Sequence, residues 1–329
     1  MVTIYSYDRA KGILGQPTIG ELPELLEAEK VDLWVDLEDP DEQEQLILRD
    51  VFGFHELAIE DCIQSQIEEP KLDDYEDYLF MVLHPLYFKR EDFLFDIRQL
   101  DLFFGRNYVV TYHQKPTFGI NRLKHALGSS IDFMGRGTDE IFHTIIDSLV
   151  DNYGITFKQI ERTIYSIETE ILSNPSERTF SNLFKLKIGL INLRRILTPA
   201  EDVMKTLGET EHELIQEENR IYFQDIHDHI SSINGLLDSY TEMVTSTMNN
   251  YVSITTYRMN SALKTFTLLT LCFLLPTLIT SLFSMNVGLP LQGVSPPESG
   301  NHLGFLFVLG LNVVSIGLML WYFKKKGWL

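Results

Sequence analysis

Two long uncharged stretches dominate the pattern of apolar and polar positions, and both lie near the C-terminus. Residues 265–283 form a stretch of 19 positions without a charge, and residues 303–323 form another of 21. Each is close to the roughly 20 residues with which an α-helix crosses the hydrocarbon core of a bilayer. No comparable stretch occurs before Lys264. The pattern predicts an integral membrane protein held in the lipid bilayer by a hairpin of two transmembrane helices, with an external loop at 284–302.

Lysines next to the two predicted spans set their orientation. Lys264 precedes the first span, and three lysines stand in the basic tail at 324–329. Basic residues close to a span favour the cytoplasmic side. The N-terminal residues lack the charged-then-apolar pattern of a signal peptide. We therefore expect a multi-pass protein of the inner (plasma) membrane with both termini in the cytoplasm.

Residues 1–135 have the mixed pattern of an α/β domain. Short β-branched and aromatic runs bounded by turn residues predict strands, at 33–37, 78–83, 99–104 and 108–112. Amphipathic, acidic runs predict helices between them, at 41–51 and 55–62.

Residues 136–208 are predicted to form a helical hairpin. Apolar residues recur there at three- and four-residue spacing, which predicts a helix at 139–172 and a second helix from the turn at 173–176 to about Leu197. Pro199 and Gly208 predict a further break or kink.

A long stalk is expected after this hairpin. From about Glu209 to Phe283, Gly235 and Pro276 are the only glycine and proline, so residues 209–264 are predicted to continue as one helix into the first span at 265–283. A single helix of that length cannot bury its apolar face alone. We therefore expect the chain to associate with copies of itself.

Charge and composition narrow the classes of function. The chain has 27 basic and 47 acidic residues, and residues 264–329 carry four lysines and one glutamate, so the cytoplasmic part is strongly acidic. Such a domain does not bind nucleic acid through backbone charge. The negative charge either attracts cations or serves only to keep the domain soluble. Two cysteines make no disulfide framework. The sequence has no phosphate-binding glycine loop and no catalytic constellation, so we expect neither an ATP-driven pump nor an enzyme.

The first span carries a stripe of small polar residues on one helical face. Its members follow three- and four-residue steps and include Asn260, Thr270, Leu274, Thr277, Ser281 and Ser284. Two roles fit such a stripe, close helix packing through hydroxyls or the lining of a narrow wet path for a hydrated ion. Asn286, at the outer end, is either a helix cap or one amide of a ring facing an incoming cation.

Several separated segments resemble the CorA family of magnesium channels, within the two-transmembrane group that carries a Gly-Met-Asn signature. The matching stretches, in family order over nearly the whole chain, are 70–80, 260–264, 275–279, 284–286 and 322–329. The resemblance implies a homopentameric funnel, in which an α/β/α sandwich precedes long helices and the transmembrane hairpin, with pore-lining first spans and an outer ring of second spans.

The resemblance also assigns roles to individual residues. It implies a selectivity filter at Ser284, Met285 and Asn286, a hydrophobic constriction at Leu263 and Phe266, and a pore lining at Thr270, Leu274, Thr277 and Ser281. The transported ion implied is Mg²⁺, with Co²⁺ or Zn²⁺ as other candidates.

Two departures from the family pattern leave alternatives open. Ser284 stands where the signature has glycine, and the external loop has Glu298 as its only acid. The Val287–Pro290 segment is more similar to the zinc-transporting ZntB branch. The alternatives are a Zn²⁺ transporter, possibly proton-coupled, and a CorA-like membrane protein with altered selectivity or lost conduction.

A second cation site is expected on the stalk. Asp225 and Asp228 lie three residues apart, which places them on one helical face. By resemblance, Asp225 falls where the family keeps a carboxylate that binds regulatory Mg²⁺ between subunits, with a partner carboxylate from the α/β domain, for which Asp92 and Asp96 are candidates. A solvated helix face is the alternative.

Overall fold

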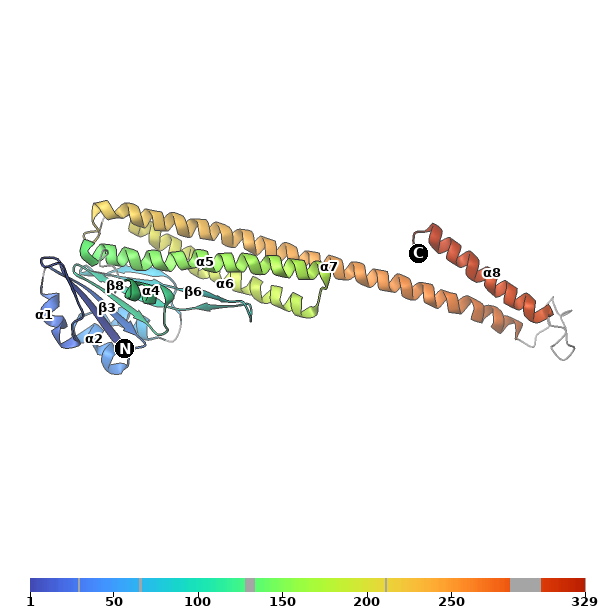
Figure 1. The fold of residues 1–329 in the computed structure, drawn as a ribbon, viewed down its shortest axis with the longest axis horizontal. Coiled ribbons are helices and arrows are strands. Elements are labelled where there is room, and N and C mark those ends of the chain that lie inside the picture. The colour runs from blue at the N-terminus through green and yellow to red at the C-terminus, as the bar shows by residue number, and fades with distance from the viewer. Residues whose placement is uncertain (29, 65–66, 128–133, 211, 285–302, 329) are drawn as a thin grey trace. The chain divides into compact units, whose positions relative to one another are not determined.

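The structure is a computed structural model, and it describes residues 1–28, 30–64, 67–127, 134–210, 212–284 and 303–328. The chain divides into two compact units, Met1–Asn249 and Asn250–Leu329. One helix, α7 (Arg220–Phe283), contributes its first part to unit 1 and the remainder to unit 2 (Figure 1).

Unit 1 is built on a seven-stranded sheet of order β2-β1-β3-β9-β8-β5-β4. Neighbouring strands pair antiparallel, except that β3 and β9 are parallel. The strands are β1 (Val2–Asp8), β2 (Ile13–Gly15), β3 (Val31–Glu38), β4 (Lys71–Asp74), β5 (Tyr78–Leu83), β8 (Leu100–Gly105) and β9 (Tyr108–His113). A separate hairpin pairs β6 (Leu86–Lys89) with β7 (Leu94–Ile97).

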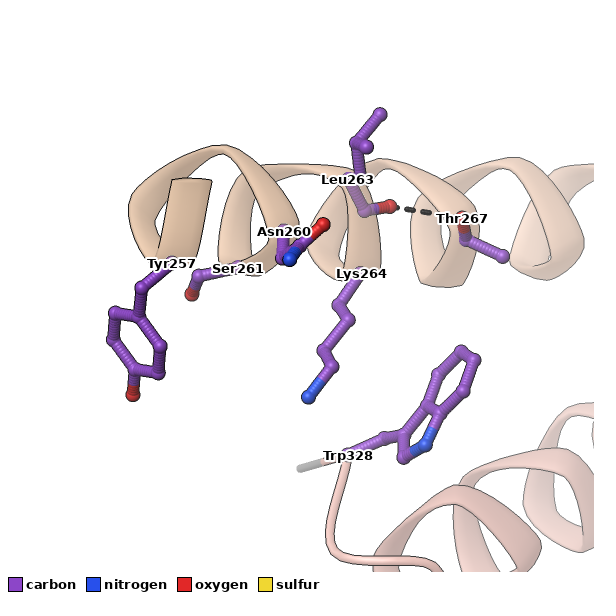
Figure 2. Close-up of a pocket in the computed structure, with 7 residues that line it drawn as sticks. All are labelled: Tyr257, Asn260, Ser261, Leu263, Lys264, Thr267 and Trp328. Carbon is purple, nitrogen blue, oxygen red and sulfur yellow. Dashed lines mark hydrogen bonds between the residues drawn. The ribbon is translucent and has the colours of Figure 1, made fainter. Parts of the chain in front are cut away.

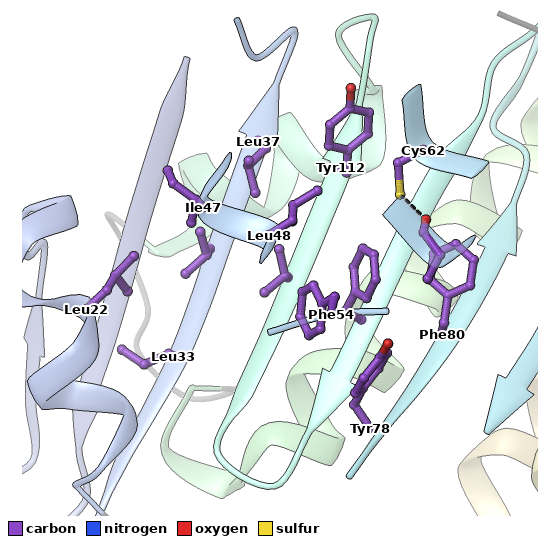
Figure 3. Packing of buried hydrophobic residues seen from close by; sticks show 14 of the residues in the cluster. Leu22, Leu33, Leu37, Ile47, Leu48, Phe54, Cys62, Tyr78, Phe80 and Tyr112 are labelled. Carbon is purple, nitrogen blue, oxygen red and sulfur yellow. Dashed lines mark hydrogen bonds between the residues drawn. The ribbon is translucent and has the colours of Figure 1, made fainter. Parts of the chain in front are cut away.

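Helices cover both faces of this sheet. One face packs against α1 (Leu22–Leu26), α2 (Glu42–Asp50) and α3 (Glu56–Ile63), in a core that includes Leu33, Val35, Leu37, Phe54 and Phe103 (Figure 3). The other face packs against α4 (Phe118–Leu127) and α5 (Thr138–Ser173). Alternate residues of a strand point to opposite faces, so the buried Leu33-Trp34-Val35-Asp36-Leu37 run serves both cores. The predicted α/β/α sandwich is confirmed.

Most of the predicted elements of unit 1 are present. The four predicted strands are confirmed as β3, β5, β8 and β9, and the two predicted helices as α2 and α3. The helix predicted at 139–172 is α5, and Ser176 caps the following helix by accepting the Thr179 amide.

Of the break or kink predicted at Pro199 with Gly208, the structure shows no break at Pro199, and the helix ends next to Gly208. Helix α6 (Glu177–Glu209) runs through Pro199 and ends one residue after Gly208. An internal proline costs a helix about 3 kcal/mol, but an apolar face packed against neighbouring helices offsets it. Residues on both sides of Pro199 belong to that buried face, namely Leu190, Leu193, Leu197, Ala200, Met204 and Leu207.

The stalk helix also begins later than predicted, at Arg220 instead of about Glu209. The intervening residues connect α6 to α7 and include the short 3-10 helix η3 (Glu217–Asn219). Asp139 at the start of α5 holds this connection, because its Oδ2 accepts the Gln216 amide at 3.3 Å and the Asn219 side-chain amide at 2.8 Å.

Helices α5, α6 and the first part of α7 form a bundle in unit 1. Ring contacts of Phe142 with Phe223 and of Phe157 with Tyr240 show that α5 and α7 run in the same direction. Asn234 donates to the Leu197 carbonyl. The buried residues of α7 recur at three- and four-residue spacing and end at Thr247.

Unit 2 contains the rest of α7 and α8 (Leu303–Lys325), and both helices are long and apolar enough to cross a membrane. They coincide with the predicted spans at 265–283 and 303–323. Many large apolar side chains of α7 in this unit are exposed, among them Phe266 and Phe273. This is the distribution expected for a helix whose neighbours are lipid or other chains.

Candidate functional site

The predicted pore residues share one face of α7. At 3.6 residues per turn, they fall within an arc of about 80°. All are exposed in the single chain: Leu263, Phe266, Thr270, Leu274, Thr277 and Ser281.

The opposite face of α7 is the more covered one. Its residues are partly buried, and they are Leu268, Leu271, Cys272, Leu275 and Ile279. The helix therefore has a partly covered apolar stripe and a wider open side, which carries the hydroxyls together with large apolar residues such as Leu269 and Phe273. Because the open side has no covering element among the described residues, it is available to other copies of the chain or to a pore.

The threonine hydroxyls on the open face are oriented by their own helix. Thr270 Oγ1 donates to the Phe266 carbonyl at 2.9 Å, and Thr277 Oγ1 donates to the Phe273 carbonyl at 2.7 Å. This bond uses the hydroxyl proton, and the oxygen keeps lone pairs that can accept. An oxygen held in this way suits a hydrated cation, since the water protons around a cation point outward.

The predicted filter is only partly described. Ser284 lies in the turn after α7, where its amide bonds the Thr280 carbonyl at 3.1 Å and its Oγ donates to the Ser281 carbonyl at 3.0 Å. The serine side chain thus continues the bonding of the last helical turn. Met285 and Asn286 lie outside the described residues, so their filter role stays a prediction.

A pocket of about 440 Å³ lies beside α7 just before the predicted span (Figure 2). Tyr257, Asn260 and Lys264 line it together with Trp328 of the C-terminal tail, and the Lys264 and Trp328 side chains both extend into the space between α7 and the tail. Lysine and tryptophan are the residues that mark a membrane–water interface. The presence of both residues around one pocket fits the predicted position of the span boundary.

The predicted carboxylates of the stalk are exposed on α7. The Asp225 side chain is 67% exposed, and its Oδ2 lies 3.8 Å from Nε2 of His229. The Asp228 side chain is 80% exposed, and its Oδ1 lies 3.2 Å from Nδ1 of His227. Both can reach a cation from solvent or from another chain.

Helix α5 adds groups that the sequence reasoning missed. Burial and the charge of Asp151 raise the pKa of the Asp147 carboxyl, the neighbouring His143 and His229 oppose this, and Asp225 adds to it. Charged groups on α7 therefore affect the pKa of a carboxyl group on α5. The signal was present as four-residue spacing in both helices, but their pairing depends on how the bundle packs.

The two candidate partner carboxylates lie on the β6–β7 hairpin. Asp92 is in its turn, and Asp96 is on β7, surrounded by Arg98 at 2.9 Å, Lys89 at 3.7 Å and Lys115 at 3.9 Å. Burial raises the pKa of Asp96, but the Arg98 hydrogen bond and the nearby lysines bring it below its usual value. Among the described residues, no hydrogen bond or ion pair joins this hairpin to Asp225, so the pairing across subunits stays a prediction.

Comparison with known proteins places these features in a family. The family model described as CorA-like Mg²⁺ transporter protein matches residues 29–325. The putative metal ion transporter YfjQ of Bacillus subtilis is 33% identical over 90% of this chain and 89% of its own length. The cobalt/magnesium transport protein CorA of Thermotoga maritima is 26% identical over 84% of this chain and 78% of its own length. A zinc transport protein ZntB of Pectobacterium carotovorum is 26% identical over 56% of this chain and 55% of its own length.

A solved structure supports the fold. The complete CorA magnesium transporter from Methanocaldococcus jannaschii matches with a TM-score of 0.83 and 20% identity, over 100% of this chain and 99% of that chain. At this identity the match establishes the architecture of an α/β domain, long helices and two apolar C-terminal helices.

Proposed function

We propose that this chain, which belongs to the family of CorA-like Mg²⁺ transporter proteins, conducts divalent cations through a pore lined by the open face of α7. Mg²⁺ is the leading ion, and Co²⁺ and Zn²⁺ are the other candidates. The observation that carries the proposal is the two-sided α7, whose exposed side holds the hydroxyls of Thr270, Thr277 and Ser281.

We propose assembly as a homopentamer, which is the state that the family resemblance implies, and the open face of α7 supports association of copies of the chain. A helix with a hydroxyl-bearing side left open in the single chain gains partners when copies gather around a common axis. The five α7 helices then enclose the pore, and Leu263 and Phe266 form a hydrophobic constriction that closes by dewetting. In this arrangement both termini lie in the cytoplasm and the protein sits in the inner membrane, as the flanking lysines favour.

The membrane potential is the proposed driving force. Moving one charge across 100 mV is worth about 2.3 kcal/mol, so a divalent cation gains about 4.6 kcal/mol. The strongly acidic chain, with a net charge of −20, raises the local concentration of cations near the pore.

Thr277→Val tests the pore face. The change keeps the side-chain shape and removes the oxygen, so we expect Mg²⁺ flux into proteoliposomes to fall severalfold. Thr265→Val is the matched control, because Thr265 makes the same bond to a carbonyl four residues back, at 3.1 Å, from a different face of α7. Equal flux in both variants and the parent protein would remove Thr277 from the pore lining.

Regulation by cytoplasmic metal is proposed at Asp225. Magnesium prefers carboxylate oxygens and keeps several waters, which suits an exposed carboxylate between subunits. Metal bound there favours the closed state by differential affinity for the two states. Asp225→Asn should weaken inhibition of flux by internal Mg²⁺, whereas Glu242→Gln, an exposed acid further along α7, should leave it unchanged. Asp92→Asn and Asp96→Asn test the two candidate partners in the same assay.

A Zn²⁺ transporter is the second candidate, and the match to a ZntB protein favours keeping it. A pH gradient that stimulates Zn²⁺ uptake, with little Mg²⁺ uptake, would select it.

A CorA-like membrane protein that has lost conduction is the third candidate, and Ser284 is the residue that motivates it. In that case Ser284→Gly should switch flux on.

A further inference from the structure

A buried group of polar side chains lies on the face of the sheet that α4 covers. Strands β3 and β9 are parallel and in a register that places Asp36 beside Thr111 and Glu38 beside His113. The four residues form a two-by-two patch on one face, at the carboxyl ends of two adjacent parallel strands. Such strand ends are where α/β sheets commonly hold ligands.

The patch brings metal-ligating atoms close together, and most of them are buried. One ligand atom from each of Asp36, Glu38 and His113 lies within 4.8 Å of the others. The Asp36 and His113 side chains are fully buried, whereas 25% of the Glu38 side chain is exposed. The site therefore has two fixed ligands and one that can move.

The orientation of His113 is the strongest indication. Its Nδ1 lies 2.8 Å from the Lys115 carbonyl, which can only accept, so Nδ1 carries the proton and donates. Its Nε2 then faces Asp36 Oδ1 at 3.1 Å. Two acceptors face each other there unless a proton or a metal ion stands between them. Histidine that ligates a metal commonly donates its other N–H to a backbone carbonyl in this way.

A chain of donors also fixes the carboxylate. Trp34 Nε1 donates to Thr111 Oγ1 at 3.1 Å, and Thr111 Oγ1 donates to Asp36 Oδ1. Outer hydrogen bonds of this kind hold metal ligands in position.

The position of a cation is taken by a lysine side chain. Lys124 of α4 places its Nζ 2.5 Å from Asp36 Oδ2 and 3.3 Å from Glu38 Oε2, and 15% of its side chain is exposed. It compensates the two carboxylates, and its long side chain reaches solvent. A metal ion that entered would have to displace this ammonium group.

We propose that Asp36, Glu38 and His113 form a binding site for a transition-metal dication of the Zn²⁺ or Co²⁺ class, with Lys124 as a tethered cation that competes with the metal. One imidazole and two carboxylates suit Zn²⁺ and Co²⁺ better than Mg²⁺, which prefers oxygen ligands alone. Metal–ligand distances near 2.0–2.2 Å require the ligand atoms to close around the ion, and the partly exposed Glu38 side chain has the most room to move. The three ligand residues lie on β3 and β9, whereas the proposed pore residues and Asp225 lie on α7.

Co²⁺ binding to the full-length protein in detergent tests the proposal. After chelation, Co²⁺ is titrated in the presence of excess Mg²⁺, and the visible d–d absorption of a low-coordinate nitrogen–oxygen site is followed. Excess Zn²⁺ should abolish the signal. His113→Gln should weaken binding at least about tenfold, since loss of an outer-shell partner alone costs about 10–100-fold. His125→Gln, which changes an exposed neighbour of Lys124, should leave binding unchanged.

Lys124→Met gives a result that a merely structural lysine would not. Removal of the competing charge should tighten Co²⁺ binding by about tenfold or more, and Zn²⁺ should raise the melting temperature of this variant more than that of the parent protein. If Lys124→Met does not accumulate, the comparison of the parent with His113→Gln and His125→Gln decides alone. Binding that is absent in the parent, or equal in the parent and His113→Gln, overturns the proposal and assigns a proton to His113 Nε2.

Discussion

Asp101 on β8 gives the sharpest stability prediction, because its carboxyl is buried in the sheet. The residue is 1% exposed, and the carboxyl accepts from Gln99 Nε2 at 2.8 Å. Burial raises the pKa of Asp101 to about 8, against the opposing hydrogen bonds from Gln99 and Cys62. Between the ordinary value of 3.8 and about 8, the folded chain holds a proton that the unfolded chain has lost. This contribution to stability is therefore full below the lower value and is lost as the pH rises through the higher one.

Asp101→Asn replaces the neutral carboxyl with a group of the same shape that does not titrate. Each pH unit in this window changes the free energy of unfolding of the parent protein by about 1.4 kcal/mol. From about pH 5 to pH 7, the free energy of unfolding of the variant should therefore rise by about 3 kcal/mol relative to that of the parent protein. For a unit of this size, that corresponds to a relative rise in melting temperature of roughly 5–10 °C.

Thermal unfolding of the full chain in detergent, followed by circular dichroism across this pH range, measures the difference. Glu91→Gln, at an exposed position in the turn before β7, is the control and should melt in parallel with the parent protein. Parallel curves for Asp101→Asn and the parent would show that Asp101 does not keep its proton in the folded chain, and would refute the reasoning.

Three further changes test the packing and electrostatics of unit 1. Phe223→Ala should destabilise by about 3–5 kcal/mol, because this fully buried ring joins α7 to α5, and melting temperature measures it. Gly189→Ala should cost about 1–3 kcal/mol, because a Cβ there would lie 2.2 Å from the Phe95 ring, between α6 and β7; chemical denaturation measures it. Burial raises the pKa of Asp32 to about 6 against the charge of Arg9, so Asp32→Asn should raise the melting temperature above pH 6 and change it little below about pH 4.

Matched variants separate these effects from general damage. Leu172→Ala removes an exposed side chain and should cost little. Gly154→Ala should stabilise by up to about 1 kcal/mol, since nothing lies within 4 Å of its added Cβ. A loss of stability in Gly154→Ala equal to that in Gly189→Ala would contradict the steric explanation. An Asp32→Asn difference that does not grow with pH would contradict the electrostatic one.

The elements that the sequence predicted are those with a strong local pattern. The apolar runs of β5 and β9 and the three- and four-residue periodicity of α5 were sufficient. The strand β4 was missed because Lys71–Asp74 is short and charged, and pairing with β5 provides its structure. Helix α6 continues through Pro199 because burial outweighs a local penalty that the sequence shows clearly.

The candidate sites divide in the same way. The grouping of the hydroxyl residues on one face of α7 follows from helical periodicity alone, so it could be predicted without a structure, whereas their proposed pore role comes from the family resemblance. The approach of Asp147 to Asp225 depends on how two helices pack, and the meeting of Asp36 with His113 depends on the register of strands 77 residues apart. No local pattern encodes either contact.

Cation flux into proteoliposomes that contain the full-length protein tests the central claim most directly. An inside-negative potential is imposed, and entry of Mg²⁺, Co²⁺, Ni²⁺ and Zn²⁺ is followed with an internal indicator. Protein-free vesicles are the control, and chloride flux is measured for comparison. The account predicts uptake of Mg²⁺ and Co²⁺ that depends on the protein and increases with the potential. Absence of any divalent-cation flux from correctly inserted, intact oligomers would contradict it.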